Sequence, residues 1–356
     1  MARLVVLDAD DPAFVDRLRR AWDGGDAVLP LDPRLPGPAR DAVLAAARPA
    51  EPMEPGDALA VATSGTTGEP KVAILTHTAI RASAVATSER LGVDPSSDRW
   101  LACLPLAHVG GSSVVTRSVI TGTPLTVHQG FDPDAVARAA DEGCTLTSLV
   151  PTALARVDPT RFRAILLGGQ APPADRPPHV IATYGLTETG SGVVYDGVPL
   201  PGVEIRIARD HEIEVRGPML LRAYRDGTDP KDADGWLPTG DLGDLVDGAL
   251  HVHGRRGDLI ITGGENVWPT AVERALLTHP SVAEAAVVGR PDPEWGQRVV
   301  AVVVPYDPGA PPMLEELRDH VRQTLPAHAA PTVLQVVLTL PRTASGKVRR
   351  ADLSAP

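Results

Sequence analysis

Cysteine is scarce in this chain, because Cys103 and Cys144 are the only two among 356 residues. Two thiols cannot build a disulfide framework or a four-ligand metal site, and both lie in apolar runs that are typical of strands. We therefore expect two core residues rather than reactive thiols, and a reducing cytoplasm as the protein's location. The apolar stretch at the N-terminus is too short for a signal peptide, and no apolar run reaches membrane-spanning length.

Positive charge is also in deficit. The chain has 34 Lys and Arg against 45 Asp and Glu, which gives a net charge of -11. This balance argues against a broad surface for nucleic acid, so an anionic substrate must be met by local cations. The hydrophobic share of 43% is ordinary for a soluble globular protein. We therefore interpret the 36 prolines as loop residues between helices and strands, and not as a sign of disorder.

Short apolar runs alternate with helix-period segments from about residue 58 onward. The periodicity predicts helices over His77–Leu91, Gly110–Ile120 and Asp132–Glu142, each following a strand-like run. In the third of these, Asp132 can cap the helix and Pro133 suits its first position. Such alternation is typical of a layered α/β sheet.

The pattern changes after the stretch "VIATYGLTETG". The segment "VEIRIARDHEIEVRG" alternates strictly and predicts β hairpins, and a further compact unit follows from Gly257. We place a domain boundary at "GRRGD", where glycine gives flexibility between two hydrophobic segments. The prediction is an α/β protein: a large N-terminal domain of layered α/β sheets with a β-rich segment over residues 1–254, and a small C-terminal α+β domain over residues 255–356.

The stretch "ATSGTTGEPK", residues 62–71, is rich in Gly, Ser and Thr and ends on Lys71. Glycines let the backbone approach a ligand, hydroxyls donate hydrogen bonds, and a lysine adds a mobile positive charge, so the composition suits a phosphate. The spacing is not that of a Walker A loop, and Pro70 disfavours a helix start at Lys71. The alternative is a flexible surface turn between two strands.

Three further motifs carry chemistry. In "TYGLTET", Tyr184 could stack on a base, Thr187 could bind phosphate, and Glu188 could hold Mg²⁺, a hard cation that prefers oxygen ligands. "PTGDLG" predicts Asp241 in a turn, where its carboxylate could accept hydrogen bonds from both ribose hydroxyls. "PRTASGKVRR" presents Lys347 in a Gly/Ser turn. Each residue also has a purely structural interpretation. Tyr184 could be a core aromatic residue and Glu188 a solvated acid. Asp241 could be a turn residue that hydrogen-bonds its own backbone, and Lys347 a surface cation.

Taken together and in this order, "TSGTTGEPK", "YGLTET", "TGD", "GRRGD" and "PRTASGK" resemble the adenylate-forming superfamily of acyl-CoA ligases, firefly luciferase and peptide-synthetase adenylation domains. The resemblance runs from about Leu59 to the C-terminus. It implies that a carboxylate attacks the α-phosphate of ATP to give an acyl-adenylate, and that a thiol then displaces AMP. It also implies that the C-terminal domain is mobile and swings near "GRRGD" between the two steps, although Gly257 stands where the family commonly has an acid.

The resemblance also implies roles for individual residues. It places the ATP phosphates on Thr63, Ser64, Gly65, Thr66, Thr67 and Gly68, with Lys71 as support. It places the purine beside Gly168, Gly169 and Gln170 of "LLGGQAP" and beside Thr183, Tyr184 and Gly185. It gives Asp241 and Arg255 to the ribose side, Glu188 to Mg²⁺, and Thr187 and Lys347 to the charge that develops during adenylation.

The resemblance also indicates which thiol accepts the acyl group and which carboxylic acid is activated. "ITGGENVWP" resembles the segment that acyl-CoA ligases present to coenzyme A, where Gly263 and Gly264 would let pantetheine pass close to the backbone. Only about 60 residues precede the phosphate loop, and "GDAVLPLDPRLP" looks like a compressed remnant of a longer subdomain. Short actinobacterial o-succinylbenzoate-CoA ligases of menaquinone synthesis are similar, so we expect this dicarboxylate as the acid.

Arg117 supports that expectation, because it stands in an otherwise apolar, small-residue segment nine positions after His108. A buried arginine is costly unless it is paired or directed at an anion, and the second carboxylate of o-succinylbenzoate would be such an anion. His108 resembles the family's gating position at the acyl pocket, which Gly169 and Gly185 would also line. The alternative for Arg117 is an ion pair with an acid of the protein itself.

Two other functions remain open at this stage. One is a CoA ligase for another aromatic or short-chain acid, and the other is a non-catalytic adenylate-binding module. The partners expected are ATP, coenzyme A and a carboxylic acid, without nucleic acid or membrane insertion. A homodimer is also an expectation, because a short N-terminal region would leave apolar surface to cover.

Overall fold

The computed structural model describes residues 1–64, 70–173, 175–342 and 348–354. The chain divides into two compact units, residues 1–206 with 214–239, and residues 207–213 with 240–356. The predicted α/β class with a smaller C-terminal part is confirmed, whereas the boundary at residue 255 stays a prediction. Within the residues described, no helix is both long and apolar enough to cross a membrane.

Two sheets lie wholly within the described residues of the first unit. One has the order β1-β2-β3-β4-β14, with β1 (Leu4–Asp8), β2 (Ala27–Leu31), β3 (Asp57–Ser64), β4 (Pro70–Thr76) and β14 (Ala223–Tyr224). The other has the order β11-β10-β9-β8-β7-β5-β6, with β5 (Trp100–Ala102), β6 (Leu125–Val127), β7 (Leu146–Leu149), β8 (Ala164–Leu167), β9 (Val180–Gly185), β10 (Gly192–Tyr195) and β11 (Val198–Pro199). The strands from β6 to β9 run parallel, as expected for strands joined through helices.

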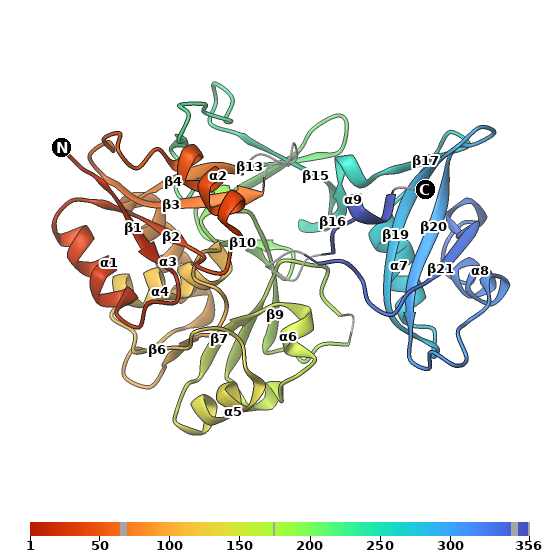
Figure 1. Ribbon diagram of the computed structural model, residues 1–356, viewed down its shortest axis with the longest axis horizontal. Helices are drawn as coiled ribbons and strands as arrows, with labels where there is room; N and C mark the ends of the chain where they lie inside the picture. The colour runs from red at the N-terminus through yellow and green to blue at the C-terminus, as the bar shows by residue number, and fades with distance from the viewer. Residues whose placement is uncertain (65–69, 174, 343–347, 355–356) are drawn as a thin grey trace. The chain divides into compact units, whose positions relative to one another are not determined.

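The helices of this unit are α1 (Phe14–Asp23), α2 (Gly37–Ala47), α3 (His77–Leu91), α4 (Val109–Thr121), α5 (Pro133–Asp141) and α6 (Pro151–Leu154), with short 3-10 turns η1 (Pro159–Arg161) and η2 (Thr187–Thr189). Figure 1 shows α2 over strands β3 and β4, where Val43 and Ala47 join the buried core. Helix α3 packs against β3 and β4, α4 packs against β5 and β7, and the two helices pack against each other. This arrangement gives the layered core that the alternation predicts.

Local sequence signals set the helix ends. Helix α3 has the predicted bounds, because the Thr76 hydroxyl accepts the backbone N–H of Ala79 at 3.1 Å and Gly92 ends the helix in a left-handed conformation. Helix α4 extends one residue beyond the prediction at each end. The Asp132 carboxylate caps α5 by accepting the N–H of Ala135 at 2.7 Å, as predicted.

The alternation begins earlier in the chain than expected. Strands β1 and β2 pair in parallel, and Val28 of β2 lies opposite Leu59 of β3, so residues before 58 extend the first sheet. Their apolar side chains, including Leu29 and Leu31, are buried in the same core as β3 and β4. The N-terminal stretch is therefore an integral layer of the fold.

A third sheet has the order β12-β13-β15-β16, with β12 (Glu204–Ile207), β13 (Glu212–Arg216), β15 (Leu237–Val246) and β16 (Ala249–Arg255). The predicted hairpin over "VEIRIARDHEIEVRG" is confirmed by the pairing of β12 with β13. Asp241, however, lies inside β15 opposite Arg255 and not in a turn. Gly240 takes a positive φ of 72° within the strand, so the "TGD" sequence marks a local irregularity and does not end the strand.

The remaining elements are β17 (Ile260–Thr262), β18 (Glu265–Val267), α7 (Pro269–Leu277), β19 (Val282–Asp292), β20 (Gly296–Pro305), α8 (Leu314–Arg322), β21 (Val333–Val336) and α9 (Ala351–Ser354), with 3-10 turns η3 (Arg256–Asp258) and η4 (Ala327–Ala329). Helices α7 and α8 lie beside β20 and β21 in Figure 1. Along β20, Val299, Ala301 and Val303 share a core with residues of α7 and α8, whereas Val300 and Val302 share a core with Leu340 and Leu353. A sheet covered on both faces explains the near-continuous apolar run "RVVAVVVP".

Candidate active site

Glu188 lies in the 3-10 turn η2, directly after strand β9. The backbone N–H of Leu186 donates to the Thr189 hydroxyl at 2.8 Å, and that hydroxyl donates to the Ser191 carbonyl at 2.7 Å. Thr189 is buried, so the turn is fixed from inside. At Gly185 a Cβ would lie 2.2 Å from the Ser191 carbonyl oxygen, which admits only glycine. The sequence "YGLTET" thus folds into one rigid bend that sets the position of the Glu188 carboxylate.

Tyr224 connects Glu188 with Lys71. Its hydroxyl donates to Glu188 Oε1 at 2.8 Å, and Lys71 Nζ lies 5.0 Å from the centroid of its ring. Lys71 pairs with Thr63 across the β3–β4 hairpin, so the end of the phosphate-loop motif lies in register with its beginning. The structure therefore brings Lys71, the last residue of "TSGTTGEPK", and the "YGLTET" turn to the same tyrosine, although they are more than 110 residues apart in the sequence.

A divalent cation fits Glu188 on chemical grounds. Within the described part of the chain, no group of three or more His, Cys, Asp or Glu side chains could hold a metal by itself. Mg²⁺ does not need such a cage, because it is commonly bound by one or two carboxylates together with substrate phosphates and water. A single carboxylate held by a tyrosine, with a lysine beside it, suits a cation that arrives with a polyphosphate.

The predicted purine segment follows strand β8. A Cβ on Gly168 would lie 2.8 Å from Thr183 Oγ1, and the Thr183 hydroxyl donates to the Leu167 carbonyl at 3.2 Å. Strands β8 and β9 pair in parallel, with Leu167 opposite Ala182, so Gly169 and Gln170 follow β8 at the same edge of the sheet at which Tyr184 stands in β9. These residues meet at the carboxyl ends of adjacent parallel strands, where α/β sheets bind their ligands. Their contact with a purine stays a prediction.

Arg117 lies on α4 and is only 2% exposed. Its guanidinium carbon stands 4.8 Å from the centroid of the Trp100 ring, and Nη2 donates to the Ser191 hydroxyl at 3.4 Å. Nε and Nη1 have no hydrogen-bond partner among the residues that the structure describes. Burial lowers the pKa of the guanidinium, partly offset by Tyr195. No carboxylate of the described residues forms a salt bridge with this cation, which the ion-pair alternative would require.

His108 stands at the N-terminal end of the same helix and precedes its first residue, Val109. The Ser112 hydroxyl donates to the His108 carbonyl at 3.1 Å, which anchors the first turn of α4. One helix thus carries both residues that the sequence assigns to the acid, His108 at its start and Arg117 in its buried middle. Whether His108 gates an acyl pocket stays a prediction.

In the second unit, Arg255 Nε lies 2.9 Å from Asp241 Oδ1. Asp241 is buried, and its neighbour Gly240 donates its backbone N–H to Glu212 Oε1 at 2.8 Å. The other Glu212 oxygen accepts from Arg256 Nη2 at 2.8 Å. Glu212 therefore ties the "TGD" sequence to "GRRGD", and the structure unites these two motifs in one ionic cluster.

Gly263 and Gly264 form the two-residue turn between β17 and β18 and have φ values of 59° and 84°. Two positive φ angles in a two-residue hairpin require glycine or asparagine, and this requirement is a structural reason for the "GG" of "GGEN". Five residues with expected roles lie outside the described residues: Gly65, Thr66, Thr67, Gly68 and Lys347. Ser64 ends strand β3.

Cys103 and Cys144 are buried, as the sequence predicts. Burial raises the pKa of the Cys103 thiol to about 11. A thiol of this kind stays protonated at neutral pH and is a poor nucleophile. The site therefore does not use a cysteine of this chain to hold the acyl group.

Sequence reasoning missed Tyr224, Ser191 and Glu212. Tyr224 stands in "LLRAYRDG", which has no periodic or glycine-rich signal. Ser191 follows "TYGLTETG" closely enough to have been included, and its hydroxyl meets Arg117. Glu212 was noticed only as part of an alternating strand.

Comparisons with known proteins show which family the chain resembles over most of its length. A family model described as AMP-binding enzyme matches residues 3–225, and one described as AMP-binding enzyme C-terminal domain matches residues 271–347. The match begins well before Leu59, where the motif resemblance starts. A protein of Mycobacterium tuberculosis named probable 2-succinylbenzoate–CoA ligase is 43% identical over 94% of this chain and 93% of its own length.

Solved structures of similar fold include an enzyme named for the same acid. An o-succinylbenzoate CoA synthetase from Bacillus subtilis, in complex with the acyl-adenylate intermediate, has a TM-score of 0.79 and 32% identity over 99% of this chain and 83% of its own. The same synthetase in complex with ATP and magnesium ion has a TM-score of 0.78 and 32% identity over 98% of this chain and 84% of its own.

Proposed function

The chain belongs to the AMP-binding enzyme family, and from that premise we propose that it is an AMP-forming acid–thiol ligase that joins 2-succinylbenzoate (o-succinylbenzoate) to coenzyme A. In the first step a carboxylate oxygen of the acid attacks the α-phosphorus of ATP, and the bond to pyrophosphate breaks. In the second step the sulfur of coenzyme A attacks the acyl carbon, and AMP leaves with the electron pair of the acyl–oxygen bond. ATP, Mg²⁺ and coenzyme A are the cofactors of this reaction.

The described residues supply binding and charge for the first step. Glu188 would hold Mg²⁺, which neutralises phosphate charge when bound, and the Lys71 ammonium adds a second positive group beside it. Asp241 and Arg255 would hold the ribose side of the nucleotide. Two anions must approach each other in this reaction, so positioned cations lower the barrier by offsetting their repulsion.

The observation that supports 2-succinylbenzoate as the acid is the environment of Arg117. Its buried guanidinium has two nitrogens without a partner among the described residues, and a third directed at Ser191, three positions after Glu188. A cation in this state is stabilised by a ligand that brings an anion. 2-Succinylbenzoate has two carboxylates, so one can be activated while the other meets Arg117. A monocarboxylic acid would leave the cation without its anion.

The test is release of AMP by the purified protein with ATP, Mg²⁺ and coenzyme A, across a panel of acids. We expect 2-succinylbenzoate to have a kcat/KM about ten- to hundredfold above that of benzoate or a medium-chain fatty acid, because a charged hydrogen bond contributes about 1.5–3 kcal/mol. Equal efficiency with a fatty acid would reject the dicarboxylate and favour a ligase for another acid. Absence of ATP–pyrophosphate exchange with every acid would instead favour a non-catalytic adenylate-binding module.

The cytoplasmic location and the homodimer expected from the sequence remain predictions. A cytoplasmic enzyme would find ATP and coenzyme A in the same compartment. Gel filtration with light scattering would determine whether the chain is a dimer.

A further inference from the structure

Tyr224 touches two charged groups of the candidate active site at once. Its hydroxyl donates to Glu188 Oε1 at 2.8 Å, and the Lys71 ammonium lies 5.0 Å from its ring centroid. Glu188 and Lys71 belong to different segments of the chain, a 3-10 turn and a hairpin strand. One aromatic side chain from a third segment, β14, therefore joins them.

Strand pairing explains why the ring lies beside Lys71. Tyr224 stands directly opposite Ala73 in the antiparallel pair of β14 and β4. Lys71 is two positions before Ala73 and so shares the face of the strand on which Tyr224 packs, at the diagonal position of the ladder. The same segment also holds the turn of Glu188, because Leu221 donates its backbone N–H to the Glu188 carbonyl at 2.7 Å.

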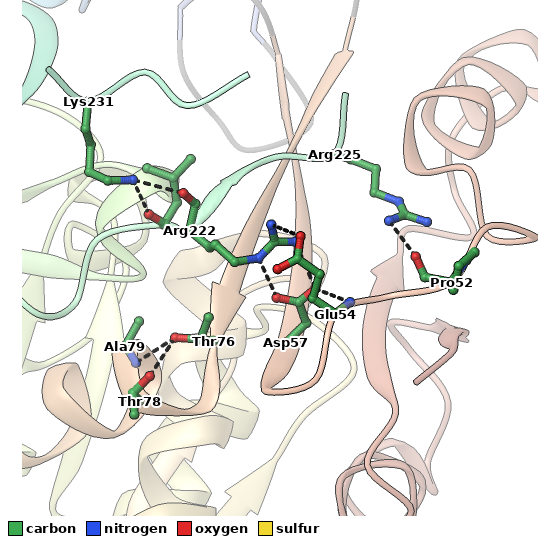
Figure 2. Close-up of polar contacts among 10 residues, drawn as sticks. Pro52, Glu54, Asp57, Thr76, Thr78, Ala79, Arg222, Arg225 and Lys231 are labelled. Carbon is green, nitrogen blue, oxygen red and sulfur yellow. Dashed lines mark hydrogen bonds and ion pairs between the residues drawn. The ribbon is translucent and has the colours of Figure 1, made fainter. Parts of the chain in front are cut away.

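The backbone on both sides of Tyr224 is anchored independently of its hydroxyl. Arg222 donates to both oxygens of Asp57 at 2.8 Å and 3.0 Å, and the Asp57 side chain is fully buried (Figure 2). Arg225 donates to backbone carbonyls, among them that of Pro52 (Figure 2). Lys231 donates to the carbonyls of Leu221 and Arg222 at 2.8 Å and 2.9 Å. Loss of the phenol hydroxyl would therefore leave the strand in place.

The chemistry of a phenol suits this position. A neutral hydroxyl that donates to one carboxylate oxygen fixes the plane of the carboxylate and leaves its negative charge for a cation. An aromatic face attracts an ammonium group without neutralising it, whereas an acidic side chain would compete with phosphate for the lysine. Tyr224 can thus hold Glu188 and Lys71 in place while both keep the charge that they need.

We propose that Tyr224 is a positioning residue for adenylation, which orients the Glu188 carboxylate toward the divalent cation carried by ATP and the Lys71 ammonium toward the phosphates. This inference rests on the proposed function, because it presupposes a nucleotide with its cation at Glu188. It assigns to the hydroxyl an effect on metal dependence and to the ring an effect on nucleotide affinity.

The experiment compares Tyr224→Phe, which removes only the hydroxyl, with Tyr224→Leu, which removes the ring as well. Calorimetry measures the affinity for ATP with and without Mg²⁺, and pyrophosphate exchange is measured over a range of Mg²⁺ concentrations. We expect Tyr224→Phe to raise the Mg²⁺ concentration for half-maximal exchange by about tenfold, as loss of one charged hydrogen bond does, with metal-free ATP binding unchanged. Tyr224→Leu should also weaken metal-free ATP binding by several-fold.

The matched control is Tyr306→Phe, which removes the hydroxyl of a tyrosine that is 72% exposed and should change neither measurement. An unchanged Mg²⁺ dependence in folded Tyr224→Phe would overturn the inference. So would an equal loss of ATP binding with and without Mg²⁺, which would assign Tyr224 a purely structural role. If the unaltered protein binds MgATP but exchanges no pyrophosphate, the proposed function fails, and the calorimetric comparison still decides the role of Tyr224.

Discussion

Among single residues, the buried arginine of α4 is the one whose surroundings bear most directly on the substrate. Other arginines of the described residues pair with carboxylates: Arg163, whose side chain is 42% exposed, donates to both oxygens of the buried Asp98 at 2.9 Å and 2.6 Å. Arg117 has instead an aromatic face, a hydroxyl and, among the described residues, no carboxylate. The difference between these two arginines suggests a role for Arg117 that folding alone does not explain.

Replacing Arg117 by methionine separates the two explanations. Methionine fills a similar volume without charge, and a buried ion replaced by an apolar group commonly leaves stability unchanged or higher. We therefore expect Arg117→Met to keep its melting temperature while the KM for 2-succinylbenzoate rises about ten- to hundredfold and the KM for ATP stays the same. Steady-state kinetics and thermal unfolding together provide the measurement.

The control is Arg163→Met, which leaves Asp98 without its positively charged partner and should lower the melting temperature without changing the KM for the acid. If Arg117→Met behaves like this control, Arg117 is a structural residue and the identity of the acid loses its main support.

At the scale of elements, contacts of one buried carboxylate join strands that the sequence separates widely. Asp98 precedes β5, and its carboxylate accepts from Arg163, just before β8, and from the Thr145 hydroxyl, just before β7. Arg163 also donates to the Leu91 carbonyl at the end of α3. One carboxylate thus links the starts of three parallel strands, one of which, β8, leads at its opposite end to Gly168, Gly169 and Gln170.

The Asp98 contacts make part of the stability pH-dependent. Burial by itself raises the pKa of the Asp98 carboxyl, but hydrogen bonds from Arg163, Thr145 and the Asp94 N–H hold the pKa below its ordinary value. A carboxyl whose pKa is lower in the folded state stabilises the fold above the unfolded pKa of about 3.9, and this contribution is lost as the pH falls through the folded pKa.

We expect Asp98→Asn to lower the free energy of unfolding at pH 7 by about 1.5–3 kcal/mol, the contribution of a charged hydrogen bond. The loss of stability with acid should also be shallower in the variant below about pH 4, because it lacks this titrating group. Urea unfolding at pH 7 and at several acidic pH values measures both effects. Parallel curves for the variant and the unaltered protein would show that Asp98 does not contribute to acid unfolding.

At the scale of the whole molecule, the chain meets its anionic substrates with a net charge of -11. Local positive side chains must therefore attract the anionic substrates, because the overall charge of the chain does not. The described positive groups of the two units belong to different motifs. Lys71 and Arg117 belong to the first unit, while Arg255 pairs with Asp241 in the second. Lys347 lies outside the described residues, so its role is a prediction from sequence.

The two half-reactions should separate by variant. If Lys347 acts only while the acyl-adenylate forms, Lys347→Ala should lower pyrophosphate exchange by about 10² or more, the usual cost of one oriented electrostatic donor. Synthetic acyl-adenylate and coenzyme A should still react at a near normal rate in this variant. Gly264→Asn should do the reverse, because asparagine tolerates the positive φ but adds bulk to the turn assigned to pantetheine.

Rapid-mixing assays of each half-reaction, with circular dichroism as the folding control, provide the comparison. A Lys347→Ala variant that is folded and equally slow in both half-reactions would show that the action of the lysine is not confined to the formation of the acyl-adenylate.

The sequence by itself determined what depends on neighbouring residues. The bounds of α3, the Asp132 cap and the glycines of the β17–β18 turn follow from local conformational preferences, which act over a few positions. The order of the motifs likewise identified the family and its nucleotide chemistry. Even the error at Asp241 has a local origin, because "TGD" is a turn signal that strand pairing with β16 overrode.

Only the tertiary structure decided which groups meet. Tyr224 lies 36 positions from Glu188 and Arg117 lies 74 from Ser191, and no local pattern encodes either contact. The absence of a carboxylate beside Arg117 among the described residues is also a property of packing, since a sequence rich in Asp and Glu offers many candidate partners. Hydrogen bonds and buried charges depend on distances of a few ångströms, and those distances are set by how strands pair and layers pack, which is a property of the folded chain as a whole.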